Sequence, residues 1–163
     1  MTEETKSGEI ELVEEVLHVR RCTKVVKGGR RFSFSALVVV GDQTGKVGLD
    51  LGKANVVSQA IEKARKKAIE NLQKVALYHE TIPHEVKGKA HATRVIMRPA
   101  SPGTGVIAGE VARAICECVG ITNILTKVIG NKNPINVARA TLDGLLQLRN
   151  RETIETLRGV SLQ

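Results

Sequence analysis

The sequence predicts an α+β protein made of two small domains. The first 78 residues hold three β-prone runs separated by turn residues, followed by a long stretch with apolar residues at helical spacing. The remaining residues show the order β-β-α-β-α, which predicts one sheet covered by two helices. With 163 residues, 42% of them hydrophobic, the chain is long enough to build these cores.

The first three strands are expected at residues 15–26, 32–40 and 46–51. Gly28 and Gly29 separate the first two runs, and glycine reaches the backbone angles of a tight hairpin turn at little steric cost. The segment 41–45 has the composition of a second turn. In the middle strand, serines alternate with Phe32 and Phe34 and then give way to apolar residues, so its second half is expected to have no polar face.

Residues 53–78 are expected to form one long helix with an apolar stripe that includes Ala60, Ala64 and Ala68. Basic residues, among them Lys63 and Lys67, cover much of its opposite surface. Taken alone, this pattern is most typical of a solvated amphipathic helix. With the three strands it completes a β-β-β-α unit.

The second domain is expected to begin with strands at 80–86 and 90–98, joined at Lys87-Gly88-Lys89. The loop 99–105 then opens a helix that includes 111–118, and Gly120 is a suitable end for it. A buried strand at 121–129 follows. Asn133 can cap a last helix, at 137–148, with Pro134 in its first turn.

The charge of the chain is unevenly distributed. Residues 1–17 hold six glutamates and one lysine, a net charge of −5, so the rest of the chain carries +13 and the whole chain +8. We therefore expect an acidic flexible tail at 1–11, a first domain at 12–78, a second at 79–150 and a C-terminal tail at 151–163. A strongly basic body indicates an acidic polymer or an anionic surface as partner.

Six basic residues and no acidic one lie between Arg20 and Arg31, around the expected hairpin turn. Because these charges cannot be buried cheaply, the hairpin is expected to project them toward a phosphate backbone. Only three aromatic residues occur in the chain, which argues against base stacking on single strands as the main mode of binding. Phe32 and Phe34 are expected in the core.

Other chemistries fit the sequence poorly. The glycines of segment 103–109 are spaced G-x-G-x-x-x-G, one residue too long for a dinucleotide-binding loop, and no Gly-Lys-Ser/Thr of a P-loop follows. Glycines before a helix can still receive an anion, or they can simply form a tight turn. Cys116 and Cys118 lack the spacing of a zinc knuckle, so no metal and no cofactor are expected. No catalytic motif is evident, and an enzyme is not expected.

No stretch approaches the roughly 20 apolar residues that a membrane span requires, so no membrane partner is expected. The odd set of three cysteines and the lack of a signal-peptide pattern favour a cytoplasmic location.

Several blocks of the chain lie at 26–34, 36–42, 47–48, 52–54, 60–61, 63–64, 86–88, 99–109 and 133–137 and run in order without obvious gaps. Together they resemble the family of ribosomal protein S-five of the bacterial small subunit. The resemblance extends from about residue 11 to residue 148. The chain departs from the family pattern at 49–51, which includes Asp50, and at 55–58.

The resemblance implies a first domain similar to double-stranded-RNA-binding folds and a second α+β domain with a left-handed βαβ connection. It implies a structural constituent of the small (30S) subunit that binds 16S rRNA where body and head meet, near the messenger entry path. It further implies contacts with ribosomal proteins S-four and S-eight, an influence on translational accuracy, and no small-molecule substrate.

The site residues follow from the basic pattern and from the resemblance together. For RNA binding they are Arg20, Arg21, Lys24, Lys27, Gly28, Gly29, Arg30, Arg31, Lys53, Lys63, Lys67, Lys87 and Lys89. For contact with a neighbouring protein they are Gly103, Thr104, Gly105 and Arg113. Two alternatives are a nucleotide-binding enzyme that uses the loop Gly103–Gly109 and a free-standing regulator of double-stranded RNA.

Overall fold

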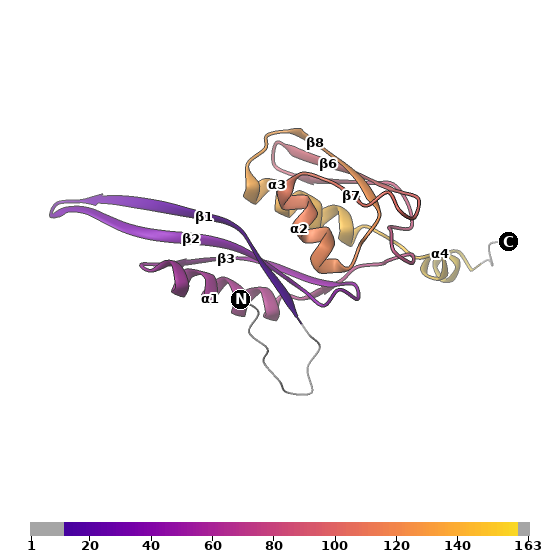
Figure 1. The fold of residues 1–163 in the computed structure, drawn as a ribbon, viewed down its shortest axis with the longest axis horizontal. Coiled ribbons are helices and arrows are strands. Elements are labelled where there is room, and N and C mark those ends of the chain that lie inside the picture. The colour runs from indigo at the N-terminus through magenta and orange to yellow at the C-terminus, as the bar shows by residue number, and fades with distance from the viewer. Residues whose placement is uncertain (1–11, 160–163) are drawn as a thin grey trace.

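The computed structural model describes residues 12–159 and confirms the α+β class with two small domains (Figure 1). The first domain holds strands β1 (Val13–Val26), β2 (Gly29–Gly41) and β3 (Lys46–Ala54), helix α1 (Val57–Glu70) and the short strand β4 (Gln73–Lys74). The second holds β5 (Val86–Ala90), β6 (Thr93–Pro99), β7 (Val106–Ile107), α2 (Glu110–Val119), β8 (Ile124–Gly130), α3 (Pro134–Leu146) and α4 (Arg151–Arg158). No helix in this described part is long and apolar enough to cross a membrane.

The first sheet has the strand order β1-β2-β3-β4 and is antiparallel throughout. As the sequence predicts, β2 is buried on both faces at its C-terminal end. Ala36, Val38 and Val40 pack toward α1, whereas Leu37 and Val39 belong to a core shared with the second domain. A strand buried on both faces needs apolar residues at consecutive positions, which is the pattern of 36–40.

Helix α1 lies unusually close to strand β3. A Cβ atom built on Gly48 would overlap the carbonyl oxygen of Ala68, and one built on Gly52 would overlap that of Ala60. The helix presents Ala60, Ala64 and Ala68 to the sheet, all fully buried. The two glycines and the alanine stripe therefore fix the helix against the strand by backbone contact.

The second sheet has the order β5-β6-β8-β7, with β7 parallel to β8 and the other pairs antiparallel. Helix α2 connects the two parallel strands. Helices α2 and α3 cover one face of this sheet, and Figure 1 shows them between the two sheets. One buried cluster accordingly contains Leu37 and Val47 of the first sheet, Ile115 of α2, and Met97 and Ile124 of the second sheet.

Several element boundaries differ from the sequence-based expectations. The long helix predicted from Lys53 ends at Glu70 and begins only at Val57, because β3 continues to Ala54 and β4 returns to pair with β3. The predicted strand at 80–86 is irregular as far as residue 85, apart from the single bridge that Thr81 forms with Tyr78, and β5 begins only at Val86. The apolar stripe correctly predicted a helix within 53–78. It could not show that the chain after Glu70 leaves the helix and pairs with β3.

The hairpin turn of the second domain was also misplaced. The chain turns at His91 and Ala92, whereas Lys87, Gly88 and Lys89 lie inside β5. Gly88 is needed for close packing, since a Cβ there would overlap the carbonyl oxygen of Ala140 in α3.

Other expectations for the second domain hold. Gly120 ends α2 with a φ of 95°, and Asn133 caps α3 by accepting a hydrogen bond from the Ile135 amide at 3.3 Å, with Pro134 in the first turn. The sequence pattern did not indicate β7 or α4. Helix α4 lies within the expected C-terminal tail and has no buried residue. The expected acidic tail at 1–11 lies outside the described residues.

Candidate nucleic-acid interface

Strands β1 and β2 extend well beyond the rest of the first domain as a two-stranded projection, the finger, comprising residues 20–35 (Figure 1). The chain turns at Lys27 and Gly28, and Gly29 has a φ of 120°, a conformation that side chains other than glycine rarely adopt. Strand β3 ends at Ala54, which pairs with Phe34. The outer part of the finger is therefore a bare hairpin with both faces open.

The pairing register divides the basic residues of the finger between two faces. On the upper face, which continues the face buried under the second domain, Arg20 pairs with Ser35 and Lys24 pairs with Arg31. Ser35 also pairs with Lys53 of β3, so Lys53 joins this row. The sequence pattern predicted Lys53 at the start of a helix. In the structure Lys53 lies in β3, at the base of the finger.

The lower face of the finger, on the side of α1, carries Arg21 and Arg30. The Arg21 guanidinium lies 4.9 Å from the centroid of the Phe32 ring, a cation–π contact that holds the arginine over the strand. Phe32 is 48% exposed, so its expected place in the core is wrong. Phe34 packs at the edge of the alanine-rich core under the sheet.

The electrostatic environment of the finger is uniformly positive. Lys24 and Arg31 lie directly opposite each other, a like-charge pair that destabilises an isolated sheet. None of the ion pairs between residues 12 and 159 involves a cation of the finger. A cluster of exposed, mutually repelling cations on an open hairpin is suited to binding a polyanion.

The acidic residues of β1 lie at its other end. The Glu14 carboxylate accepts from the Arg65 guanidinium at 2.7 Å, so α1 neutralises it. Burial, together with the neighbouring carboxylates Glu117 and Glu110, raises the pKa of Glu15. These negative charges lie close to the two helices and away from the finger tip.

The other predicted RNA-binding lysines lie apart from the finger's upper face. Lys63 and Lys67 are exposed on α1, which covers the opposite face of the first sheet. Lys87 and Lys89 are exposed on β5 of the second sheet. The sequence-predicted residues therefore form three separate surfaces.

Asp50 does not weaken the upper face. It pairs with Val38, so it lies on the side of α1. Its Oδ2 accepts a hydrogen bond from Asn71 Nδ2 at 2.9 Å, and Oδ1 accepts from the Leu51 amide. This carboxylate ties the C-terminal end of α1 to the sheet.

In the loop proposed for contact with a neighbouring protein, Gly103 and Thr104 are exposed and Gly105 is half-buried. Gly103 and Gly105 have φ values of 87° and 77°, and Thr104 Oγ1 donates to the Ser101 carbonyl at 2.7 Å. Arg113 is exposed on α2. The loop does not open the helix directly, as the sequence analysis expected, because β7 lies between them.

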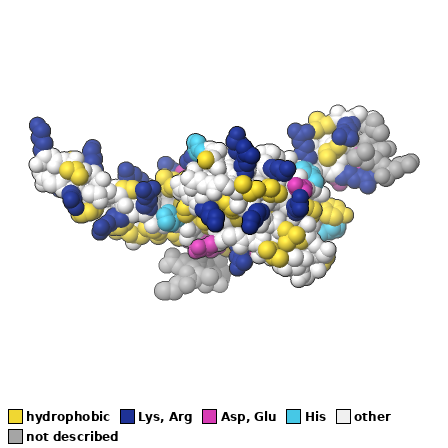
Figure 2. Space-filling view, turned by 90° about the horizontal axis from the view of Figure 1, so that it is seen from above, with side chains coloured by type: hydrophobic (Ala, Val, Ile, Leu, Met, Phe, Trp, Pro, Cys, Tyr) yellow, Lys and Arg dark blue, Asp and Glu magenta, His cyan; other side chains and the backbone are white. Residues whose placement is uncertain are grey.

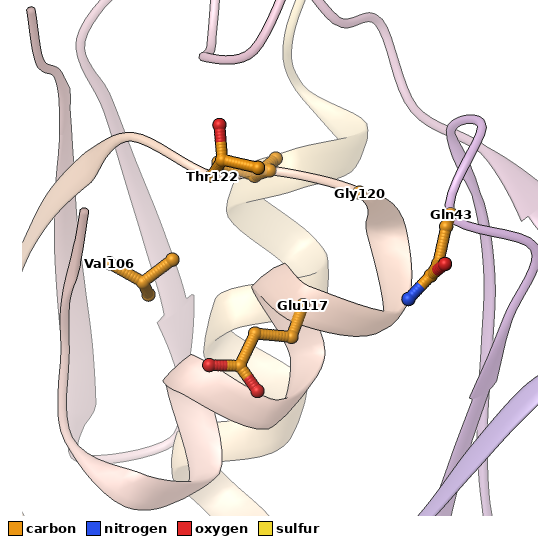
Figure 3. Close-up of a pocket in the computed structure, with 6 residues that line it drawn as sticks. Gln43, Val106, Glu117, Gly120 and Thr122 are labelled. Carbon is orange, nitrogen blue, oxygen red and sulfur yellow. The ribbon is translucent and has the colours of Figure 1, made fainter. Parts of the chain in front are cut away.

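The same geometry argues against a phosphate site at this loop. The Gly105 amide donates to Asn123 Oδ1 at 3.1 Å, and α2 begins with the carboxylate of Glu110. A nearby hollow has a volume of about 480 Å³ and is lined by Gln43, Val106, Glu117, Gly120, Ile121 and Thr122. Figure 3 draws these lining residues around it. Its charged side chain, Glu117, would repel a phosphate.

The cysteines of α2 are buried, as expected. Burial and the nearby carboxylates raise the pKa of both Cys116 and Cys118 to about 12, so both remain protonated thiols near neutral pH. Within residues 12–159 no group of three or more His, Cys, Asp or Glu side chains could hold a metal ion.

Sequence reasoning missed three basic residues on the second sheet, Arg94, Arg98 and Lys127. The period-2 alternation of residues 93–98, in which Arg94, Ile96 and Arg98 fall on one face, was the available signal. Their partners on β8 could not be identified without the pairing register.

Comparison with known proteins gives matches over both domains. The family described as ribosomal protein S5, N-terminal domain, matches residues 12–76, and that described as ribosomal protein S5, C-terminal domain, matches residues 88–158. A "small ribosomal subunit protein uS5" from Syntrophobacter fumaroxidans is 56% identical over 94% of this chain and 93% of its own length. A protein of the same name from Rubrobacter xylanophilus is 51% identical over 97% of this chain and 79% of its own.

Proposed function

Since this chain belongs to the ribosomal protein S5 (uS5) family of the small ribosomal subunit, we propose that it holds 16S rRNA through the finger. A ribosomal protein of this family is a structural, RNA-binding constituent of a ribonucleoprotein that acts in translation. The finger, whose cations are exposed and left without carboxylate partners inside the described chain, is the part suited to rRNA phosphates.

The single observation that carries this proposal is the opposition of Lys24 and Arg31 on an uncovered hairpin. In the free protein, repulsion between these two side chains weakens the hairpin. A phosphate bound between them attracts both cations and so offsets their repulsion. Contacts of this kind position the protein on folded RNA without reading its sequence. Shape recognition of this sort agrees with the scarcity of aromatic side chains.

The test replaces two finger cations that make no contact with the core, Arg30→Ala with Arg31→Ala. Binding to rRNA in small subunits that lack this protein is measured at several salt concentrations. For each phosphate that the variant no longer neutralises, the slope of log affinity against log salt falls in magnitude by about 0.7 to 0.9. We expect weaker binding, a shallower slope and an unchanged circular dichroism spectrum. An unchanged slope with an intact fold rejects the finger as the binding element.

The finer placement of the protein is part of the same proposal. It lies at the junction of body and head near the messenger entry path, and its loop at Gly103–Gly105 together with Arg113 meets protein S-four. S-eight is a second neighbour, and through these contacts the protein contributes to translational accuracy. The support is the family resemblance and the exposure of this loop. The small subunit is accordingly its location, in the cytoplasm.

The enzyme alternative is not favoured. A nucleotide site at Gly103–Gly109 would need free backbone amides and positive charge. The Gly105 amide already donates a hydrogen bond to Asn123, and the carboxylates of Glu110 and Glu117 lie nearby. Melting temperatures that do not change with nucleotides or coenzymes are the expected result.

A further inference from the structure

The second sheet has one face covered by α2 and α3 and an outer face that no described element covers. Strand register places side chains from all four strands on this outer face. They are Lys87, Lys89, Arg94, Ile96, Arg98, Ile107, Leu125, Lys127 and Ile129. Figure 2, which views the molecule from above, shows basic and hydrophobic side chains intermixed over this region and further basic side chains along the finger.

The outer face is strongly positive. Five of its nine side chains are basic and none is acidic. Directly before β5, the Glu85 carboxylate accepts a hydrogen bond from Arg98 Nε at 2.8 Å. The other four cations of the face take no part in the ion pairs found within residues 12–159. Neighbouring strands lie about 4.8 Å apart, so these cations are crowded on a nearly flat surface. Such a surface is complementary in charge to a polyanion.

Apolar side chains lie between the cations. Ile129 and Ile107 are 47% and 52% exposed, and Leu125 is 38% exposed. Ile129 pairs with Arg94, and Ile96 pairs with Lys127, so between β6 and β8 a cationic group lies opposite an apolar one. Lys89 and Arg94, by contrast, are paired cations of β5 and β6. A nucleic-acid backbone also places apolar groups beside charges, since charged phosphates are separated by ribose rings with apolar C–H edges.

Resting on the proposed function, we propose that the outer face of the second sheet is a second rRNA-binding surface, independent of the finger. It takes the sugar-phosphate backbone of folded or double-stranded RNA, with Arg94 and Lys127 on phosphates and Ile129 against ribose. The nine side chains of this face include no aromatic one, so it does not stack unpaired bases. Recognition across the shallow groove of an RNA duplex, where backbone and ribose are accessible, fits this chemistry.

The experiment places a photoreactive benzoylphenylalanine at Lys127 in the full chain, which is assembled into small subunits and irradiated. A second protein carries the same probe at Lys27, in the finger tip. A crosslink from position 127 to rRNA is the expected result. A crosslink only to protein, or none, overturns the proposal. The probe at Lys27 reports on the finger separately, so the proposed function and this inference can fail independently.

A charge variant gives a second readout. Arg94→Gln with Lys127→Gln should reduce the salt slope of binding to subunits lacking this protein by about 1.4 to 1.8, if each side chain neutralises one phosphate. The control, Lys46→Gln with Lys74→Gln, removes two exposed lysines that pair across β3 and β4, away from both surfaces. If the salt slope of the Arg94 and Lys127 double variant equals that of the control, the outer face does not contact phosphates and the proposal is overturned.

Discussion

Gly48 and Gly52 show how single residues set the geometry of the first domain. Neither has a positive φ, so neither is required for a turn. Both are required because backbone atoms of α1 occupy the space where a Cβ would stand. The glycines lie on one face of β3 and match the alanines four apart on α1.

The substitution Gly52→Ala should therefore destabilise the protein by about 1 to 3 kcal/mol, because the helix must move away from the strand. Gly28→Ala is the matched control, since nothing lies within 4 Å of a Cβ at that position. Denaturant unfolding of the two variants measures the difference. Equal stabilities would show that α1 does not depend on this close approach.

Asp42 organises the turn between β2 and β3 and is only 6% exposed. Its Oδ1 accepts hydrogen bonds from the amides of Thr44 at 2.9 Å and Lys46 at 2.8 Å. Burial opposes ionisation, but the hydrogen bonds and the Lys46 charge outweigh it and lower the pKa of Asp42. The ionised carboxylate is thus the form that holds this turn.

A lowered pKa in the folded state means that Asp42 stabilises the fold fully above its unfolded-state value of 3.8. This contribution is lost as the pH falls through the lower, folded-state pKa. We expect Asp42→Asn to cost about 1 kcal/mol at pH 7. The difference in unfolding free energy between the two proteins should shrink when the pH is lowered from about 5 to about 2. A difference that stays constant with pH would show that the charge of Asp42 plays no part.

The finger illustrates how one element serves two purposes along its length. Strand β2 has 13 residues. Its C-terminal part is buried in the core, whereas its N-terminal part is exposed in the finger. Toward the tip from Phe34, no third strand of the described chain lies beside the hairpin, and an isolated two-stranded hairpin is marginally stable in water. Cross-strand contacts such as that of Arg21 with Phe32 are what remains to hold it.

We expect the backbone amides of residues 22–33 to exchange hydrogen much faster than those of residues 36–40 in the free protein. In the assembled small subunit the finger amides should become protected, because bound RNA restricts the opening of the hairpin. Hydrogen-exchange mass spectrometry of both states measures this. Finger amides that exchange equally fast in the subunit would contradict an RNA-bound finger.

The molecule as a whole is organised as four layers: α1, the first sheet, the pair α2 and α3, and the second sheet (Figure 1). The two domains share a core in which Leu37 and Val39 meet residues of α2 and α3. Gly41 reinforces this contact, because a Cβ there would overlap the Cys118 carbonyl oxygen. The domains are therefore parts of one packed body.

Leu37→Ala should consequently destabilise both domains, by about 2 to 5 kcal/mol for a buried leucine. Hydrogen exchange of β8, in the other domain, should become faster. Val25→Ala is the control, since Val25 is 75% exposed in the finger. Unchanged protection of β8 in Leu37→Ala would mean that the domains unfold independently.

Local sequence patterns predicted the features that depend on neighbouring residues. They include the hairpin turn beside Gly29, the end of α2 at Gly120, the Asn133 cap and the apolar run 36–40. The collinear blocks of residues also predicted the family. The signals for the turn, the helix end, the cap and the apolar run each lie within a few residues of the feature they specify, so a short window contains the needed information.

Long-range pairing settled the rest. A shift in register between Val16 and His18 determines which arginines share a face of the finger, and pairing with Ser35 adds Lys53 to that face. The alternation of Arg94 and Ile96 became a surface only once β8 lay beside β6. Because side chains alternate with a period of two, a face is defined by its partner strand, and no local window contains that strand.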